Sequence, residues 1–186
     1  MTIYLTSDCH FGHDRDFIWG PRGFSSLEEH DRTIVENWNS IVTPQDTVYI
    51  LGDLMLGTNH EYGLNCLKAL QGEKYFIAGN HDTLRRQEEY QEIRLAGLGL
   101  AHILNAEGYR FYLCHYKTET SRIDNMAPLK NHLINLHGHT HSKAKFESDN
   151  PFQYNVALDC HNNYPVPLGV VINDINQKCE ECLSFL

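Results

Sequence analysis

Residues 2–10 read TIYLTSDCH, and this segment sets the pattern for the whole chain. Its β-branched and aromatic residues predict a short buried strand over Thr2–Ser7. Asp8 and His10 follow where that strand ends. Alternate side chains of an extended chain point to the same side, so both could reach one ion while Cys9 packs into the core.

The same arrangement recurs four times further along the chain. The predicted strands read DTVYIL, KYFIA, YRFYLC and LINL, and polar residues follow each of them. Functional loops of α/β sheets lie at the carboxyl ends of their strands. The sequence therefore predicts one site built from five strand ends. The residues that follow the four strands are Gly52-Asp53, Gly79-Asn80-His81-Asp82, His115 and Gly138-His139-Thr140-His141.

Helices are expected between the early strands. Ser26 and Glu29 have capping-box spacing ahead of a helix that Pro44 ends, and Asn59 can cap a second helix that stops at Gly72. A charged surface helix is expected from about Thr83 to Leu98. Further strands are expected over Gln153–Leu158 and Val170–Ile172, so the chain is interpreted as one α/β domain over residues 1–186.

Composition limits the possible partners. Lys and Arg number 15 and Asp and Glu 24, which gives a net charge of −9. Such a protein does not attract phosphate backbones over long range. Neither a signal peptide nor a run of about 18 apolar residues is visible. The six scattered cysteines do not resemble a secreted disulfide framework. We therefore expect a cytoplasmic protein without a membrane span.

The polar residues at the strand ends are metal-ligand types. Imidazole, carboxylate and amide oxygen suit Mn, Fe, Zn, Ni or Mg, and a carboxylate with two oxygens can bridge two ions. Asp53 is the central candidate for the bridge. Glycines before Asp53, Asn80 and His139 permit close backbone approach. The candidate ligands are Asp8, His10, Asp53, Asn80, His115, His139 and His141.

These motifs, D-x-H, G-D, G-N-H-D, H and G-H-x-H in that order, resemble the calcineurin-like metallophosphoesterase superfamily. They run from Asp8 to His141, and the chain's compact size is similar to that of small bacterial and phage members. The resemblance implies a four-layer α/β/β/α sandwich of two mixed sheets flanked by helices. It also implies two divalent metal ions, with Mn expected to serve in vitro, and a phosphodiester or small phosphate ester as substrate.

The resemblance also implies residue roles. Asp8, His10, Asp53 and His141 would bind one metal, and Asp53, Asn80, His115 and His139 the other. A hydroxide between the metals would attack phosphorus, and His81 would contact the phosphate and protonate the leaving oxygen as general acid. The chain departs from the protein phosphatases of the superfamily, whose G-D-x-V-D-R-G is replaced here by GDLMLG over residues 52–57. That departure leaves open which group orients His81.

Other polar residues are weaker candidates. With Asn80, His13 and Arg22 could contact the substrate phosphate, and His161 could line the cleft. Asp82 is interpreted as a turn acceptor and His137 as a hydrogen-bonded or core residue. Four further histidines are expected to be exposed: His30, His60, His102 and His132.

Two alternative functions stay open. A nuclease acting on DNA or RNA would need a basic groove, which the acidic charge disfavours. A catalytically weak metal-binding scaffold for protein interaction would not need His81, and the presence of His81 favours an enzyme.

Overall fold

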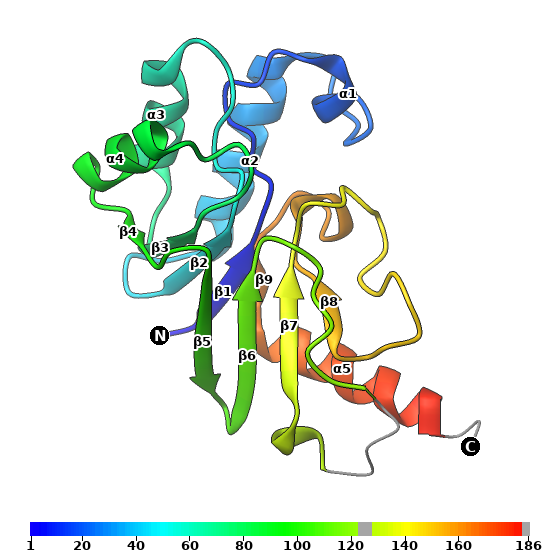
Figure 1. The fold of residues 1–186 in the computed structure, drawn as a ribbon. Helices are drawn as coiled ribbons and strands as arrows, with labels where there is room; N and C mark the ends of the chain where they lie inside the picture. Colours follow the sequence, from blue (N-terminus) through cyan, green and yellow to red (C-terminus); the bar gives the residue numbers. More distant parts are fainter. Residues whose placement is uncertain (123–127, 184–186) are drawn as a thin grey trace.

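The computed structural model describes residues 1–122 and 128–183, which form two mixed sheets flanked by helices (Figure 1). The first sheet has the strand order β4-β3-β2-β1-β9, and the second has the order β5-β6-β7-β8. The expected fold class, two mixed sheets between helices, is confirmed. The strands are β1 (Ile3–Thr6), β2 (Thr47–Leu51), β3 (Glu73–Ile77), β4 (Ala96–Gly97), β5 (Ala101–Ala106), β6 (Tyr109–Cys114), β7 (Leu133–His137), β8 (Gln153–Asn155) and β9 (Val166–Pro167).

Three helices cover one face of the first sheet: α2 (Leu27–Ile41), α3 (His60–Ala69) and α4 (Leu84–Glu92). Ile34, Trp38, Leu67 and Tyr90 of these helices pack with strand residues such as Phe76 in one buried cluster. The predicted N-caps are confirmed. The Ser26 hydroxyl accepts from the Glu29 amide at 3.1 Å, and the Asn59 side chain accepts from the Tyr62 amide at 3.1 Å.

A second cluster fills the space between the sheets. It joins the inner residues Leu5, Leu51 and Ile77 of the first sheet to residues of the second such as Leu136. The C-terminal helix α5 (Leu168–Leu183) contributes Val171 and Ile175 to this cluster and contacts β1 and β9. In the described part of the chain no helix is long and apolar enough to cross a membrane.

Strand register decides where the site lies. In the parallel part of the first sheet Thr6 pairs with Ile50 and Leu51 with Ile77, so β1, β2 and β3 end at one edge. In the second sheet β6 and β7 are also parallel, with Leu113 opposite Leu136. The Gly138 amide donates to the His115 carbonyl at 3.0 Å, so the loops after β6 and β7 touch. The loops after all five strands therefore meet.

Several local predictions were wrong. The expected strand over Val170–Ile172 lies within α5, whose buried residues Leu168, Val171 and Ile175 have helical spacing. The short apolar run Val170–Ile172 obscures this spacing in the sequence. The helix expected to reach Leu98 ends at Glu92; Arg94 takes a φ of 65° and β4 follows. The strand expected to reach Leu158 ends at Asn155 and is followed by the 3₁₀ helix η2 (Leu158–Cys160). β5 was not predicted.

None of the four histidines that were expected to be exposed to solvent is fully exposed. His30 and His132 are buried, and His60 and His102 are half-buried. His132 stacks on Phe152 with ring centroids 4.2 Å apart, and His60 contacts the Glu89 carboxylate at 2.7 Å across α3 and α4. Histidine combines a flat apolar ring with two polar nitrogens, so single positions in a sequence do not reveal its burial.

Hydrogen bonds to Asp46 connect the start of β1 with the loop between α2 and β2. Its carboxylate accepts hydrogen bonds from the Thr2 amide at 2.6 Å and from the Thr43 amide and hydroxyl at 2.9 and 2.7 Å. These bonds hold the pKa of Asp46 at about 2. A carboxyl group whose pKa is lower in the folded state adds stability above its unfolded pKa, and that stability is lost as pH falls toward the folded pKa.

We therefore expect Asp46→Asn to be less stable than the wild type at pH 6. The difference in unfolding free energy should shrink between about pH 4 and pH 2, since the unfolded pKa is ~3.9. Urea unfolding of both proteins across this range, without added metal, measures it. A difference that stays constant with pH would contradict the role given to the charge.

Candidate metal centre

The backbone at the strand ends has an unusual conformation. Five of the seven candidate ligands have a positive φ, between 51° and 71°: Asp8, His10, Asp53, His139 and His141. The extended geometry predicted for Asp8-x-His10 is therefore wrong, although Cys9 is buried in the core as expected. A non-glycine residue in this region costs about 1–3 kcal/mol and persists only where the surroundings enforce it. Such strain is typical of functional sites.

A first cluster joins the loops after β1 and β7. The Nε2 atoms of His10 and His141 lie 3.2 Å apart. The Asp8 Oδ1 atom is 3.9 Å from each of these nitrogens. Asp8 and His10 are buried, and His141 is partly open to solvent. Three ligand atoms thus converge on one point.

A second cluster joins the loops after β2, β3, β6 and β7. The His115 Nε2 atom lies 3.4 Å from Asp53 Oδ2, 3.2 Å from His139 Nδ1 and 2.9 Å from Asn80 Oδ1. The His115 Nδ1–H donates to the Leu51 carbonyl at 2.8 Å, which leaves Nε2 free to face the other three.

Asp53 lies between the two clusters. Its Oδ2 atom is 3.4 Å from His115 Nε2 in one and 3.8 Å from His10 Nε2 in the other. Its Oδ1 atom accepts from the His81 amide at 2.9 Å. Although burial alone would raise it, contacts with His115 hold the pKa of Asp53 at about 2. A carboxylate in this place can bridge two cations.

The donor atoms fit divalent metals. Asp8 Oδ1 is fully buried and has no hydrogen-bond partner among the described residues, and burial raises the pKa of Asp8. Burying an ionised, unpaired carboxylate costs free energy, and a cation bound at the same place offsets that cost. The facing ring nitrogens of His10 and His141, and of His115 and His139, also need a proton or a metal between them. Carboxylate, imidazole and amide oxygen are the donor set of such ions.

Two glycines make this convergence possible. A Cβ atom on Gly79 would lie 2.3 Å from Asp53 Oδ1, and one on Gly138 would lie 2.3 Å from Asp8 Oδ2. Any side chain at either position would push a carboxylate away. The close backbone approach predicted for the glycines is thus confirmed at both positions.

Arg22 does not occupy the place expected of a phosphate contact. Its side chain is 1% exposed. The guanidinium binds both oxygens of Asp159, at 3.1 and 2.7 Å, and donates to the Asp8 carbonyl at 2.7 Å. Asp159 Oδ2 in turn lies 3.3 Å from His141 Nδ1. Arg22 therefore supports Asp8 directly, and His141 through Asp159, from behind the first cluster.

This buried network extends into α2. The third guanidinium nitrogen of Arg22 lies 2.9 Å from His30 Nε2, and His30 Nδ1 lies 2.6 Å from Asp31 Oδ1. Asp31 Oδ2 accepts from the Gly12 amide at 2.8 Å. Sequence reasoning missed Asp159, His30 and Asp31. The adjacent His-Asp pair at the start of a helix was the only available signal, and nothing in the sequence connects it with residue 159.

The remaining candidates lie around the centre. The His81 ring is 40% exposed, with Nε2 3.9 Å from Asp53 Oδ2, and no hydrogen bond to this ring is found in the described part of the chain. His13 has its ring centroid 5.6 Å from that of His10.

His137 is buried, as expected. His161 lies at the end of η2, where Nε2 is 3.0 Å from the Asn155 carbonyl, which ties it to the fold.

Asp82 is confirmed as a turn acceptor. Its carboxylate accepts from the amides of Asp53, Leu54 and Gly79 at 2.7, 3.1 and 2.8 Å, and from the Tyr90 hydroxyl at 2.8 Å. It therefore ties the loops after β2 and β3 together directly beneath the centre.

The comparisons with known proteins agree with this geometry. The family model described as the calcineurin-like phosphoesterase superfamily domain matches residues 1–163. The chain belongs to this superfamily. It is thus a phosphoesterase-family protein with two clusters of His and Asp side chains suited to divalent metals.

The chain is also similar to proteins of comparable length. The chain is 31% identical over 178 residues to the uncharacterized protein MJ1445 of Methanocaldococcus jannaschii, an alignment that covers 94% of this chain and 92% of that protein. It is 31% identical over 205 residues to the Gene 66 protein of Mycobacterium phage D29, covering 94% and 98%. The fold is similar to that of AQ665 from Aquifex aeolicus, with a TM-score of 0.71, 23% identity and coverage of 92% and 98%.

Removal of metal should destabilise the protein. Binding to the folded state alone at 100 times the dissociation constant adds ~2.7 kcal/mol, and ~1 kcal/mol shifts Tm by ~2–4 °C at this size. We expect Mn²⁺ to raise Tm by about 5–10 °C over the EDTA-treated protein. Asp8→Asn should lose much of this shift. An equal shift in the wild type and the variant would argue against Asp8 as a ligand.

Asp159→Asn should weaken binding of the ion at the Asp8–His10–His141 cluster. The amide can no longer offer His141 and Arg22 a charged acceptor, and loss of such support typically costs 10–100-fold in metal affinity. Calorimetric Mn²⁺ titration should show one of two sites weakened. The exposed Asp149, replaced by Asn, is the matched control. Unchanged affinity at both sites would remove Asp159 from this role.

Proposed function

We propose that the protein is a dinuclear-metal-dependent phosphoesterase that hydrolyses phosphodiesters or small phosphate esters. The observation that carries the proposal is the position of Asp53, whose Oδ2 atom faces His115 of one cluster and His10 of the other. Asp8, His10, Asp53 and His141 would hold one ion, and Asp53, Asn80, His115 and His139 the other. Mn, Fe, Zn, Ni and Mg all suit these donors.

Two ions bound there would polarise the phosphoryl oxygens and supply hydroxide from water at neutral pH. The residues of the chain do the rest. Asn80, with its amide oxygen 2.9 Å from His115 Nε2, also has an amide nitrogen that can donate to a phosphoryl oxygen. The open side of the site is formed by the partly exposed rings of His81, His139 and His141.

His81 is the proposed general acid. Its amide is fixed by Asp53 and its carbonyl accepts from Arg86 at 2.6 Å, so the backbone is held while the ring faces solvent beside the ligands. A protonated imidazole there can donate to the leaving oxygen as the P–O bond breaks. Such help is typically worth ~10²–10⁴-fold and matters most for alkoxide leaving groups.

The alternatives are weaker on the same observations. A scaffold would not need a solvent-facing histidine next to an interior carboxylate bridge. A nuclease would need a positive groove along the substrate, and the net charge of −9 does not favour one. The cytoplasmic location expected from the sequence remains part of the proposal.

The test is hydrolysis of bis(p-nitrophenyl) phosphate with Mn²⁺. We expect turnover by the wild type and retention of two bound metals in His81→Ala. For an ester with an alkoxide leaving group, the variant should lose at least a hundredfold in kcat; for p-nitrophenolate the loss should be smaller, because this group needs less protonation. His102→Ala, on β5, is the control. Equal losses for both leaving groups would reject the acid role, and absence of metal-stimulated turnover would reject the enzyme.

A further inference from the structure

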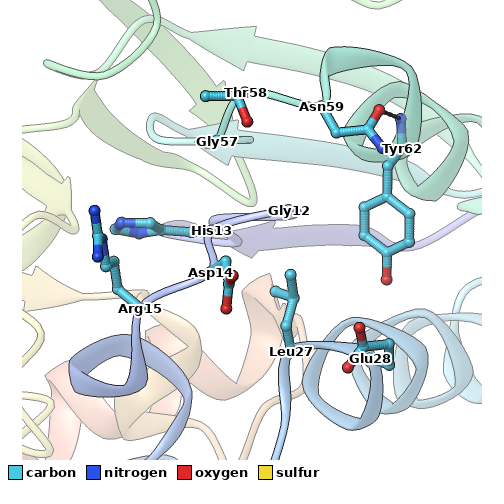
Figure 2. A pocket seen from close by; sticks show the side chains of 10 residues that line it. All are labelled: Gly12, His13, Asp14, Arg15, Leu27, Glu28, Gly57, Thr58, Asn59 and Tyr62. Carbon is cyan, nitrogen blue, oxygen red and sulfur yellow. Dashed lines mark hydrogen bonds between the residues drawn. The ribbon is translucent and has the colours of Figure 1, made fainter.

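A cavity of about 450 Å³ opens beside the proposed centre. It lies between the loop after β1, the start of α2, the loop after β2 and the start of α3 (Figure 2). Small-molecule sites are typically ~300–1,000 Å³, so its volume suits one organic group. The metal-facing residues described above do not line it. Its lining is Gly12, His13, Asp14, Arg15, Leu27, Glu28, Gly57, Thr58, Asn59 and Tyr62.

The walls of the cavity are preformed. The Leu56 amide donates to the Phe11 carbonyl at 3.0 Å, and a Cβ atom on Gly57 would lie only 2.2 Å from the Gly12 carbonyl oxygen. Asp31 of α2 accepts from the Gly12 amide at 2.8 Å. These contacts fix the two loops relative to α2, so a ligand would find these walls of the cavity already formed.

His13 stands between the cavity and the metal-facing residues. Its ring centroid is 5.6 Å from that of His10, which is itself 5.6 Å from that of His81. The Nδ1 atom of His13 is buried and has no hydrogen-bond partner among the described residues. His10 thus has as ring neighbours both His13 of the cavity and His81, the proposed general acid, beside which the leaving alcohol of the substrate would depart.

Arg15 is the positively charged residue of the cavity lining, and Asp14 and Glu28 are its carboxylates. In Figure 2, His13 and Arg15 lie at one side, and Glu28 and Tyr62 lie together at the other, with Asp14 between them. Carboxylates accept hydrogen bonds and repel anions. The far end thus suits hydroxyl groups and opposes a second phosphate or a carboxylate.

We propose that this cavity binds the leaving alcohol of the substrate and that this alcohol is a polyhydroxy group of the glycerol or sugar type. Its hydroxyls donate to Glu28 and Asp14, while His13 and Arg15 lie toward the phosphate. This inference rests on the proposed phosphoesterase function and adds the substrate class.

Three methyl phosphodiesters of matched skeleton test it as competitive inhibitors of bis(p-nitrophenyl) phosphate turnover. Their second alcohols are 2-propanol, glycerol through its central hydroxyl, and lactate. Hydrogen bonds to charged acceptors lead us to expect a Ki about tenfold lower for the glycerol ester than for the 2-propanol ester. The lactate ester should bind worst.

Glu28→Lys should reverse this order. The ratio of the Ki of the 2-propanol ester to that of the glycerol ester should fall toward one. The Ki of the lactate ester should fall at least tenfold. Glu36→Lys makes the same change on the same helix at a side chain that is 67% exposed, and should keep the wild-type order. Equal Ki values for glycerol and 2-propanol esters, or the same order in both lysine variants, would overturn the proposal. Absent turnover of bis(p-nitrophenyl) phosphate would instead reject the phosphoesterase function.

Discussion

The burial of two carboxylates at the ends of adjacent parallel strands is the constraint on which the rest of the structure depends. Asp8 is 0% exposed and Asp53 2%. Removing an ionised carboxylate from water costs several kcal/mol unless hydrogen bonds or cations replace the water. Asp53 accepts from the His81 amide and faces His115, whereas Asp8 Oδ1 accepts no hydrogen bond from any residue that the structure describes. The imidazoles of His10 and His141 converge on the same place, so a cation bound there would offset this cost.

The strained backbone lies at the same strand ends as these buried carboxylates. Positive φ values at Asp8, His10 and Asp53 turn each strand end sharply toward the neighbouring loop. Asp82 holds the turn at Asp53 by accepting from the amides of Asp53, Leu54 and Gly79, and Arg22 donates to the Asp8 carbonyl. Strain of this kind persists because many hydrogen bonds oppose its release. The centre is therefore rigid before any ligand arrives.

Sequence predicted the parts of the site that lie next to strands. Asp8, Asp53 and His115 follow apolar runs whose ends must align in a parallel sheet, so their convergence followed from the pattern. Asp159 and His30 could not be found in this way. They lie in a 3₁₀ turn and a helix, and only tertiary packing brings them to Arg22. Arg22 was misjudged for the same reason, since its carboxylate partner is 137 residues away. The strand expected over Val170–Ile172 failed because a short apolar run does not distinguish a strand from a buried helix face.

Helix α2 contacts both the network behind the first cluster and the cavity. Its first turns carry Glu28 in the cavity, His30 against Arg22, and Asp31 under Gly12. The Asp31 carboxylate therefore contacts both the Gly12 amide at the cavity and the His30 imidazole that faces Arg22. A shift of this helix would move His141 through Arg22 and Asp159 while reshaping the cavity. If the cavity binds the leaving alcohol and the clusters hold ions, as proposed, both functions depend on the position of α2.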